Sequence, residues 1–557
     1  MNVPPLFLFE DDHLLVINKP PGINTHAASP HSSDGIYDWL RNRSPDHATL
    51  SIHQRLDQET SGVLLFGKTR EANQSLAKQF EERTVQKTYL LLTDRDPGQL
   101  PRKVRSNIFK AGGNDFQSSS QITRGQNAET EFTLVEQTSL GWLIEARPLT
   151  GRTHQIRIHA RDSGFPILGD SLYEGTLHSR LCLHAHKLRL QHPTEDRELE
   201  LTAPIDFERN PHVWLRQALW PEAETDSWRL IHGTSSNFPG WYVDRLGDYL
   251  LSQSASDLSP TRQTALENWV NQLGLLGVYH KQLDRHIRKS QPGDVSPHLI
   301  IGKPAPQRFE IKENGVRYSM SFEEGYSVGL FLDQKDNRNR LLSGHLFPQL
   351  SKGVSPPAPP DSRCCRAASR QSQNDPEVSI FPNGTAVLNT FAYTCGFSVC
   401  AAKAGATVTS IDLSKKYLDW GRDNFRLNDI DPDEHDFIFG DCFDWMKRLA
   451  KKGRQFDIVL LDPPTFSKSK KSGVFKADKD YGRLITESLA LLKPNGILFA
   501  STNCSTLKPE DFLTTVRSAI QSSGRKLVQE FFATQSPDFP TSREEPGYLK
   551  TVWLRVL

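Results

Sequence analysis

The residues that first suggest chemistry form the stretch His53-Gln54-Arg55-Leu56-Asp57-Gln58-Glu59-Thr60-Ser61-Gly62, in which a carboxylate follows an arginine by two positions. The apolar run at residues 63–66 comes next and predicts a buried strand. A loop held by a rigid strand often carries catalytic groups, and an ionised carboxylate can serve as nucleophile or base. The alternative is structural, because Asp before Thr-Ser-Gly is common in turns and helix caps.

A second dense stretch is Pro148-Leu149-Thr150-Gly151-Arg152-Thr153-His154-Gln155-Ile156-Arg157-Ile158-His159. Gly151 ends a predicted strand at residues 143–146, and Thr153 can cap a helix. On that helix His154, Arg157 and Ile158 share one face, so Arg157 can point inward to a carboxylate. A solvated basic helix face is the alternative, and the apolar neighbour Ile156 weighs against it.

The last third of the chain places acids and a thiol after predicted strands. Strands at residues 385–389, 408–412, 437–439, 456–461 and 496–500 alternate with helices, which predicts a doubly wound parallel sheet. Ligands bind such sheets at the carboxyl ends of the strands, where Asp412 suits ribose hydroxyls. Cys504 comes just beyond the fifth strand, either as a nucleophile or as a small buried thiol. A nicotinamide-binding domain has similar topology, but no G-x-G-x-x-G follows the first strand.

Composition limits the class of protein. The chain has 557 residues, too many for one core, with 37% hydrophobic and 24% charged residues. A net charge of +1 means that attraction to nucleic acid must come from local patches. The 7 cysteines form no C-x-x-C pair, which indicates a reducing compartment and argues against a disulfide framework or a zinc site. Neither a signal peptide nor a membrane span is recognisable, so we expect a cytoplasmic protein.

The pattern along the chain predicts a multidomain fold. We expect an α+β mixed-sheet domain at residues 1–207, a linker at 208–225, a small α+β domain at 226–305, and an α/β doubly wound, Rossmann-like domain at 306–557. Residues 351–383 are rich in Ser, Pro, Arg and Gln and predict a disordered insertion.

The first 207 residues resemble the RluA family of pseudouridine synthases. The resemblance rests on Lys19-Pro20-Pro21-Gly22, Arg55-Leu56-Asp57-x-x-Thr60-Ser61-Gly62, Lys87-x-Tyr89, the stretch 151–159, Gly164-x-Pro166-Ile167-Leu168-Gly169-Asp170 and Leu183-His184-Ala185, in the order of the family. In this family the C1′–N1 bond of a uridine in RNA is cut, the base rotates, and C5 is joined to the sugar, without cofactor or metal.

The resemblance implies functional roles for four residues of these motifs. The essential carboxylate falls on Asp57, as nucleophile at C1′ or as base in the competing glycal route, and the family's tyrosine and arginine fall on Tyr89 and Arg157. A stacked uridine must flip out to react, and Arg55 would fill the vacated position. One departure is Gln54, which separates His53 from Arg55 where the family reads His-Arg-Leu-Asp.

Residues 226–557 are similar to class I S-adenosylmethionine-dependent methyltransferases, and more narrowly to the RlmI-like family that modifies 23S ribosomal RNA. The resemblance rests on Pro239-Gly240 to Asp248, Phe331-Leu332-Asp333-Gln334, Asn389-x-Phe391-x-Tyr393-Thr394, Asp462-Pro463-Pro464-x-Phe466 and Pro546-Gly547-Tyr548-Leu549-Lys550. It implies that S-adenosyl-L-methionine is bound by Asn389, Phe391, Tyr393, Gly396, Asp412, Asp441 and Asp462, with Gln334 and Arg338 closing over it. Cys395 stands where relatives commonly have Gly, which predicts a looser approach of the backbone to the cofactor.

The dipeptide Cys504-Ser505 is relevant to which atom of the base is methylated. Carbon 5 of cytosine is a poor nucleophile, and enzymes that methylate it first add a Cys thiolate at C6. Members of the family with this activity carry Cys-Ser near this place, which implies that Cys504 is catalytic together with Asp462. If Cys504 is inert, a nitrogen of guanine is the expected target, held by residues 462–466. A group of lysines after this motif either contacts phosphate or forms a solvated face: Lys468, Lys470, Lys471, Lys476 and Lys479.

Together these features predict a bifunctional RNA-modifying enzyme that isomerises uridine and methylates a base, most simply in ribosomal RNA, with transfer RNA as the alternative partner. No membrane and no metal are expected. Two alternatives remain: a methyltransferase whose synthase half only binds RNA, and a methyltransferase with a non-RNA substrate.

Overall fold

The computed structural model describes residues 3–29, 32, 34–112, 115–119, 125–283, 296–324, 327–348, 381–469, 471 and 473–557. The chain divides into two compact units. Unit 1 comprises Met1–Ala28, Asp34–Arg41 and Thr49–Pro221, and unit 2 comprises Ser29–Ser33, Asn42–Ala48 and Glu222–Leu557. The change of unit at Pro221 falls within the linker expected at residues 208–225, and the finer domain boundaries stay a prediction.

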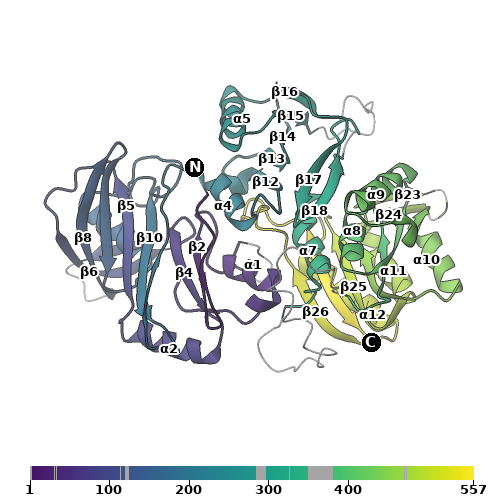
Figure 1. Ribbon diagram of the computed structural model, residues 1–557, viewed down its shortest axis with the longest axis horizontal. Helices are drawn as coiled ribbons and strands as arrows, with labels where there is room; N and C mark the ends of the chain where they lie inside the picture. Colours follow the sequence, from purple (N-terminus) through teal and green to yellow (C-terminus); the bar gives the residue numbers. More distant parts are fainter. Residues whose placement is uncertain are drawn as a thin grey trace. The chain divides into compact units, whose positions relative to one another are not determined.

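Unit 1 is built on a mixed sheet, as the sequence predicts. In the described residues the sheet has 11 strands, in the order β1-β2-β4-β10-β5-β9-β8-β6-β7, with β11 beside β10 and β3 beside β4 (Figure 1). The strands are β1 (Phe7–Glu10), β2 (Leu14–Lys19), β3 (Ser51–Ile52), β4 (Ser61–Gly67), β5 (Gln86–Thr93), β6 (Arg102–Gly112), β7 (Asp115–Ser119), β8 (Gln126–Thr138), β9 (Gly141–Pro148), β10 (Leu183–Gln191) and β11 (Glu198–Thr202). The helices are α1 (Ile36–Arg43), α2 (Arg70–Glu81), α3 (Gln155–Asp162) and α4 (Pro211–Leu219).

Local sequence explains the elements that matter for the site. Strand β4 is buried at every position, as its apolar run predicts, and it is antiparallel to β2 and parallel to β10. Helix α2 begins where the Thr69 hydroxyl accepts a hydrogen bond from the Ala72 amide, a favourable N-cap. The predicted cap at Thr153 is wrong, because α3 is preceded by His154 in a left-handed conformation that makes no side-chain cap bond.

Unit 2 begins with a sheet in the order β12-β13-β14-β15-β16, followed by a hairpin. The sheet contains β12 (Ser227–His232), β13 (Trp241–Leu246), β14 (Tyr249–Ser254), β15 (Gly277–Gln282) and β16 (His298–Gly302), with helix α5 (Pro260–Leu273). The hairpin of β17 (Phe309–Glu313) and β18 (Val316–Met320) turns at Asn314 and Gly315. Both turn residues have positive φ, 52° and 74°, which is the backbone that Asn-Gly adopts readily in a two-residue hairpin loop.

The larger sheet of unit 2 has the doubly wound form that the sequence predicts. Among the described residues it has 7 strands in the order β21-β20-β19-β22-β25-β27-β26, parallel from β21 to β25, with β27 antiparallel to both its neighbours. Its elements are β19 (Ala386–Thr390), β20 (Thr407–Asp412), β21 (Asp436–Phe439), β22 (Phe456–Leu461), β25 (Leu492–Thr502), β26 (Leu527–Ala533), β27 (Lys550–Val556), α7 (Lys335–Ser343), α8 (Gly396–Lys403), α9 (Lys415–Leu427), α10 (Cys442–Lys451), α11 (Ala477–Leu489) and α12 (Pro509–Ser522).

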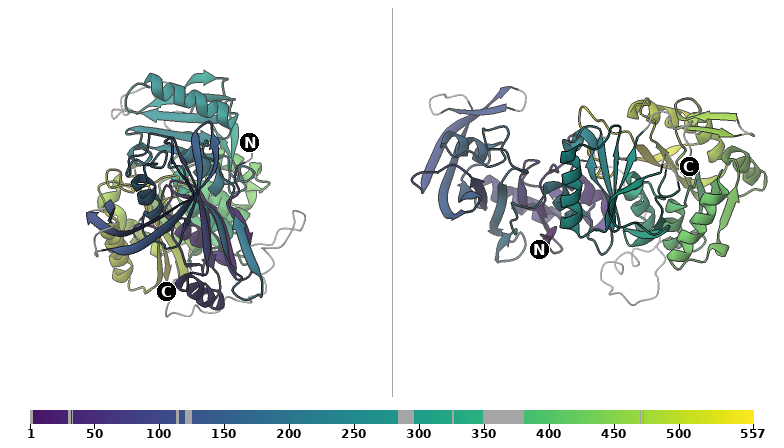
Figure 2. Two further views of the ribbon diagram at one scale, coloured as in Figure 1. Left: turned by 90° about the vertical axis from the view of Figure 1, so that its left-hand side faces the viewer. Right: turned by 90° about the horizontal axis from the view of Figure 1, so that it is seen from above.

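Each face of this sheet carries its own apolar core. Successive residues of a strand point to opposite faces. Val387 accordingly packs with residues of α8 and α9, whereas Leu388 packs with residues of α10, α11 and α12. Figure 2 shows helices on both sides of the green and yellow strands. The parallel strands are therefore covered on both faces, and their carboxyl ends remain available for a ligand.

Residues 351–380 of the predicted disordered insertion lie outside the described residues. Phe381, which the same prediction includes, is described, and it is buried in the core that contains Val387. Within the described ranges, none of the helices is both long enough and apolar enough to cross a membrane.

A buried ion pair between Lys335 and Asp538 should be one of the most sensitive points of unit 2. The Lys335 Nζ–Asp538 Oδ2 distance is 2.9 Å, and neither side chain is exposed. Removing one member leaves the other charge buried, so we expect Lys335→Met to lower the free energy of unfolding by about 3–5 kcal/mol. Denaturant titration of the whole chain measures this change.

The matched control is Arg317→Met, which breaks the exposed pair of Arg317 with Asp429 and should cost less than about 1 kcal/mol. The double variant K335M/D538N removes the stranded charge and should recover part of the loss. A cost for K335M no larger than for R317M would contradict the prediction.

Candidate active sites

A cavity of about 990 Å³ in unit 1 brings together the residues that the sequence singled out. Asp57, Tyr89 and Arg157 all line it, although they come from the loop before β4, from β5 and from α3. Arg55 lines the same cavity and is exposed to solvent. The four predicted residues of the synthase half are therefore close in space, and their catalytic roles stay a prediction.

The loop that carries Asp57 is fixed from behind by a buried lysine. Lys19, at the end of β2, has no exposed surface and donates hydrogen bonds to the carbonyls of Pro20, Ile23 and Gln58 at 2.9, 2.7 and 3.0 Å. The Gly22 amide donates to the same Gln58 carbonyl at 2.9 Å. Burial lowers the pKa of Lys19 to about 7. The residue that follows Asp57 is thus held by two donors, which limits movement of the carboxylate.

Arg157 connects two carboxylates. Its Nε and Nη2 donate to the two oxygens of the buried Asp170, each at 2.7 Å, and its Nη1 lies 3.6 Å from Asp57 Oδ2. Burial alone would lower the pKa of Arg157, but the hydrogen bonds and charge of Asp170 outweigh it and raise that pKa. A two-point contact fixes the plane of a guanidinium. Asp170 therefore orients Arg157 so that the third nitrogen faces Asp57.

Tyr89 lines the cavity as a neutral phenol. Burial and the nearby charge of Asp57 both raise the pKa of Tyr89 above its ordinary value. The hydroxyl therefore keeps its proton at neutral pH and can donate a hydrogen bond into the cavity.

The departure at Gln54 has a structural explanation. The Gln54 side-chain amide donates to the Val63 carbonyl of β4 at 3.2 Å. His53, displaced by one position, makes a 2.9 Å contact between its Nε2 and Asn73 Oδ1 and stacks on Phe80 of α2. Both side chains support the Asp57 loop from the strand and helix beside it.

In unit 2, three predicted acids lie at the carboxyl ends of β20, β21 and β22, parallel strands of the larger sheet. Asp412 ends β20, while Asp441 and Asp462 follow β21 and β22. Asp412 accepts hydrogen bonds from the amides of Tyr393 and Ser414 at 2.9 and 2.8 Å, and burial raises its pKa. Asp441 caps α10 by accepting from the Asp444 amide at 3.0 Å. Carboxylates at these strand ends are of the type that binds ribose hydroxyls and amino groups in this sheet topology.

The connection from β19 to α8 has an unusual backbone. Phe391, Tyr393 and Cys395 alternate in the left-handed region, with φ of 58°, 50° and 64°. Each such position costs a non-glycine residue about 1–3 kcal/mol, and strain of this kind is concentrated at functional sites. Asn389, which precedes the connection, is buried and donates from Nδ2 to the Ser398 hydroxyl of α8 at 2.8 Å. The donors and acceptors at this edge of the sheet fit S-adenosylmethionine, whose ribose and amino acid parts need both.

Cys395 has a backbone conformation that favours Gly. A left-handed φ suits Gly, and Cys395 occupies it with its side chain fully buried. Space for the thiol comes from Gly421 of α9, since a Cβ there would overlap the Cys395 sulfur. Gly396 is also constrained, because a Cβ would lie 2.8 Å from Leu330 Cδ1.

Gln334 and Arg338 are held by different partners at this edge. Gln334 Nε2 donates to Ser501 Oγ at 2.7 Å and to Asp462 Oδ1 at 3.2 Å. Arg338 is buried and donates from Nε and Nη2 to the two oxygens of Glu313, at 2.6 and 2.7 Å. Gln334 thus touches a predicted site residue directly. The closing role of Arg338 stays a prediction, and its guanidinium is committed to Glu313.

Asp462 and Cys504 follow neighbouring strands whose residues Leu461 and Ala500 are paired. Burial raises the pKa of Asp462 to about 6, against the hydrogen bond from Ser501, which lowers it. Cys504 is 8% exposed, and its Sγ lies 3.2 Å from the Thr506 hydroxyl. Lys550 Nζ donates to the Cys504 carbonyl at 2.7 Å and so fixes the backbone of that residue.

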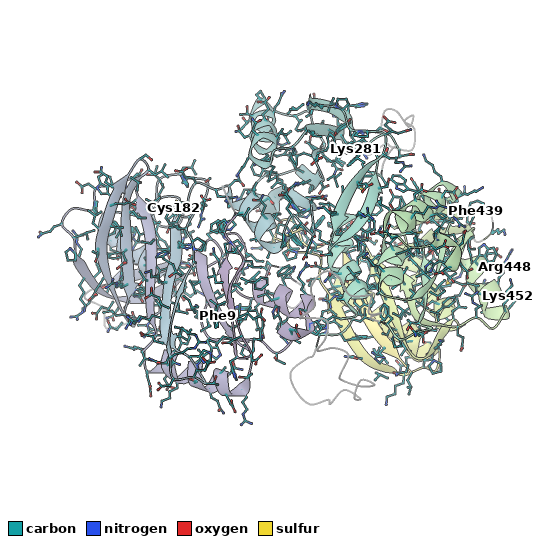
Figure 3. The ribbon with its side chains drawn as sticks, in the orientation of Figure 1. Phe9, Cys182, Lys281, Phe439, Arg448 and Lys452 are labelled. Atoms are coloured by element: carbon teal, nitrogen blue, oxygen red, sulfur yellow. The ribbon has the colours of Figure 1, made fainter. Side chains whose placement is uncertain are left out.

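An aromatic and basic surface lies at the end of β21, an edge strand of this sheet. Phe439, at the end of β21, is 59% exposed, and its carbonyl accepts from Trp445 Nε1 of α10. Arg448 lies over the Trp445 ring, and Figure 3 labels Phe439, Arg448 and Lys452 on this part of the unit. Lys471, one of the lysines for which phosphate contact or a solvated face was expected, is exposed and pairs with Asp444 at 3.0 Å, and its contact with phosphate stays a prediction.

Sequence reasoning missed the partners that hold the site residues. Neither Asp170 as the main partner of Arg157 nor Glu313 as that of Arg338 was predicted, although Asp170 belongs to one of the motifs quoted for the first family. The one available signal is chemical: a buried arginine requires a carboxylate. His154 was placed on the face of Arg157 but given no role.

Comparison with known proteins assigns a family to each unit. Residues 13–162 match the model of RNA pseudouridylate synthases, and residues 377–555 match that of S-adenosylmethionine-dependent methyltransferases. Ribosomal large subunit pseudouridine synthase C of Pasteurella multocida is 40% identical over 215 residues, 36% of this chain and 64% of that protein. The chain thus spans less than two thirds of the length of such synthases.

The second unit has relatives that match over a longer range. A Bacillus subtilis protein, YwbD, provisionally named a ribosomal RNA large subunit methyltransferase, is 30% identical over 348 residues, 61% of this chain and 77% of that protein. A ribosomal RNA large subunit methyltransferase of Deinococcus radiodurans is 28% identical over 66% of this chain and 83% of its own length. A solved structure of SMU.776, described as a methyltransferase on a provisional basis and complexed with SAH, is 25% identical, with a TM-score of 0.50, over 66% of this chain and 86% of that one.

The close packing of Cys395 against α9 predicts a compensating pair of substitutions. Gly421→Ala places a methyl group on the Cys395 sulfur, so we expect a loss of about 1–3 kcal/mol in stability from overpacking. Adding Cys395→Gly removes the sulfur and relieves the left-handed residue, and should restore stability in the double variant. Thermal unfolding of the three variants measures the coupling. Additive effects would show that the two positions do not interact.

Proposed function

The chain belongs to the S-adenosylmethionine-dependent methyltransferases, and we propose that it both methylates RNA and isomerises uridine in RNA. The isomerisation is proposed for its N-terminal RNA pseudouridylate synthase domain. Unit 1 would isomerise uridine to pseudouridine, and unit 2 would methylate a base. The observation that carries the proposal is the cavity of unit 1, which is lined by Asp57, Tyr89 and Arg157 from three separate elements. Ribosomal RNA is the proposed substrate, because the relatives of both units are named for the large ribosomal subunit.

For the isomerisation, the residues of the cavity have complementary tasks. Asp57 attacks C1′, or removes a proton from the sugar in the glycal route, while Arg157 stabilises its charge. The C1′–N1 bond breaks with its electron pair on N1, and the base rotates. In the nucleophilic route C5 then bonds to C1′ and expels the Asp57 carboxylate; in the glycal route C5 bonds to C1′ as Asp57 returns the proton to the sugar. Loss of the proton on C5 completes both routes. Tyr89 stacks on the base, and its hydroxyl donates a hydrogen bond to the sugar. Because a stacked uridine cannot reach Asp57, the nucleotide flips out, and Arg55 at the exposed side of the cavity occupies its place.

For the methylation, we propose that unit 2 binds S-adenosylmethionine at the strand ends near Asp412, Asp441 and Asp462. The cofactor supplies an electrophilic methyl group. Cys504 adds as a thiolate to C6 of a cytosine, which makes C5 nucleophilic, and the loss of the C5 proton later releases the thiolate. The support for this assignment is that Cys504 follows the strand paired with that of Asp462, with Lys550 fixing its backbone.

The isomerisation is tested by Asp57→Ala. We expect pseudouridine formation to be abolished, because Asp57 is the cavity carboxylate that faces Arg157 Nη1, while Asp170 is held by two other nitrogens of that arginine. Methyl transfer by the same preparation should be retained and reports that the protein is folded. Tritium release from 5-tritiated uridine in a large-subunit rRNA transcript measures the loss.

The matched control for this test is Asp196→Ala, at an exposed turn of unit 1. Wild-type protein that releases no tritium from any RNA would refute the isomerase assignment. Binding of RNA without release would then favour the alternative that unit 1 serves only as an RNA-binding module.

The methylated atom is tested by Cys504→Ala. If the target is cytosine C5, methyl transfer should stop, while binding of S-adenosylmethionine, measured by calorimetry, should persist. Nucleoside mass spectrometry identifies the methylated base. The control is Cys182→Ala, which removes a buried thiol from unit 1. Full activity of C504A with a methylated guanine as product would rule out the thiolate route and favour a nitrogen target. Transfer of the labelled methyl group to protein but never to RNA would exclude both cytosine C5 and a guanine nitrogen as targets.

A further inference from the structure

His154 occupies a strained backbone position at the cavity of unit 1. Its φ is 56°, in the left-handed region, directly before α3, and its side chain does not cap the helix. A non-glycine residue pays about 1–3 kcal/mol for such a conformation, which persists only where the surroundings enforce it. Helix capping therefore does not account for this histidine.

The imidazole of His154 is held in one orientation. Its Nδ1 lies 2.8 Å from the Tyr173 hydroxyl, and the rings of Phe116 and Tyr173 meet it edge to face with centroids at 5.5 and 5.6 Å. Only 13% of the side chain is exposed. If the Tyr173 hydroxyl donates to Nδ1, the proton of the neutral ring lies on Nε2.

The other nitrogen of the ring faces the essential carboxylate. His154 Nε2 lies 3.9 Å from Asp57 Oδ2, the same oxygen that Arg157 Nη1 approaches at 3.6 Å. Both separations exceed a hydrogen bond. The two nitrogens therefore define a position beside the reacting carboxylate where a substrate atom can be contacted, and Arg157 is already oriented by Asp170.

We propose that His154 is a further catalytic residue, which donates a hydrogen bond from Nε2 to O2 of the uracil as it leaves C1′. This inference rests on the proposed isomerase function. When the C1′–N1 bond breaks, its electron pair passes to N1, and the negative charge spreads to O2 and O4. A fixed donor aimed at developing charge lowers the barrier without reorganisation. The proposal holds for both routes open to Asp57, since each cleaves the same bond.

Tyr173 is the positioning residue for this contact. Its hydroxyl fixes the tautomer and the plane of the His154 ring, and its own ring lies under the Arg157 guanidinium at 5.1 Å. Its amide also donates to Asp170 at 3.2 Å. One tyrosine thus links the two groups that face Asp57.

The test compares His154→Phe, His154→Gln and the control His178→Phe, whose side chain does not line the cavity. Single-turnover pseudouridine formation on a large-subunit rRNA transcript should fall about 100-fold in H154F, as for loss of one donor at developing charge. H154Q keeps an N–H donor and should regain at least a tenth of the wild-type rate. RNA affinity and methyl transfer should be unchanged in all three.

A transcript with 5-fluorouridine separates this role from a structural one. Fluorouracil is a more acidic base than uracil and leaves with its charge better stabilised. Because fluorine replaces the proton that C5 must lose, the rate measured on both RNAs is the disappearance of the C1′–N1 nucleoside, and the defect of H154F in this cleavage should shrink at least tenfold on the fluorinated RNA. A defect of equal size on both bases, or an H154F rate within threefold of wild type, overturns the inference. If wild-type protein forms no pseudouridine, the proposed function fails instead.

Discussion

The cavity of unit 1 depends on one interaction, the two-point ion pair of Arg157 with Asp170. A lone guanidinium near Asp57 would be free to rotate and to pair fully with it, which would hold the carboxylate back from a substrate. Because Asp170 takes two of the nitrogens at 2.7 Å, the third stays 3.6 Å from Asp57. At this distance the third nitrogen faces Asp57 without forming a hydrogen bond that would cover the carboxylate.

Unit 2 uses the same principle with other residues. Arg338 forms a two-point pair with Glu313, which comes from the β17–β18 hairpin, and Lys335 pairs with Asp538 without any exposure. Lys335 and Arg338 both lie on α7. This helix begins directly after Gln334, whose side chain donates a hydrogen bond to Asp462. Buried pairs contribute little net stability, but breaking them is costly, so they define one arrangement of α7. The position of Gln334 follows from these pairs.

The sequence could predict what depends on neighbouring residues. Strand β4, helix α2 and the Asn314–Gly315 turn follow from apolar runs, a Thr cap and turn preferences, all of them local. The alternating burial of β19 follows from the two-residue period of a strand. The partners of Arg157 and Lys19 could not be predicted, because they meet only when distant strands assemble. Thr153 has a side chain suited to a helix cap. The cap position is nevertheless occupied by His154, whose backbone is left-handed.

Backbone strain marks both sites in the same way. Asn and Asp tolerate positive φ, so the informative cases are the other side chains. Among the described residues these are Arg83, His154, Glu174, Phe391, Tyr393 and Cys395. Four of the six lie at the two proposed sites, where neighbouring groups enforce them: Tyr173 on His154, and Asp412 on Tyr393. Strain held by such contacts places donors before a substrate binds, and this preorganisation is what both charge-stabilising sites require.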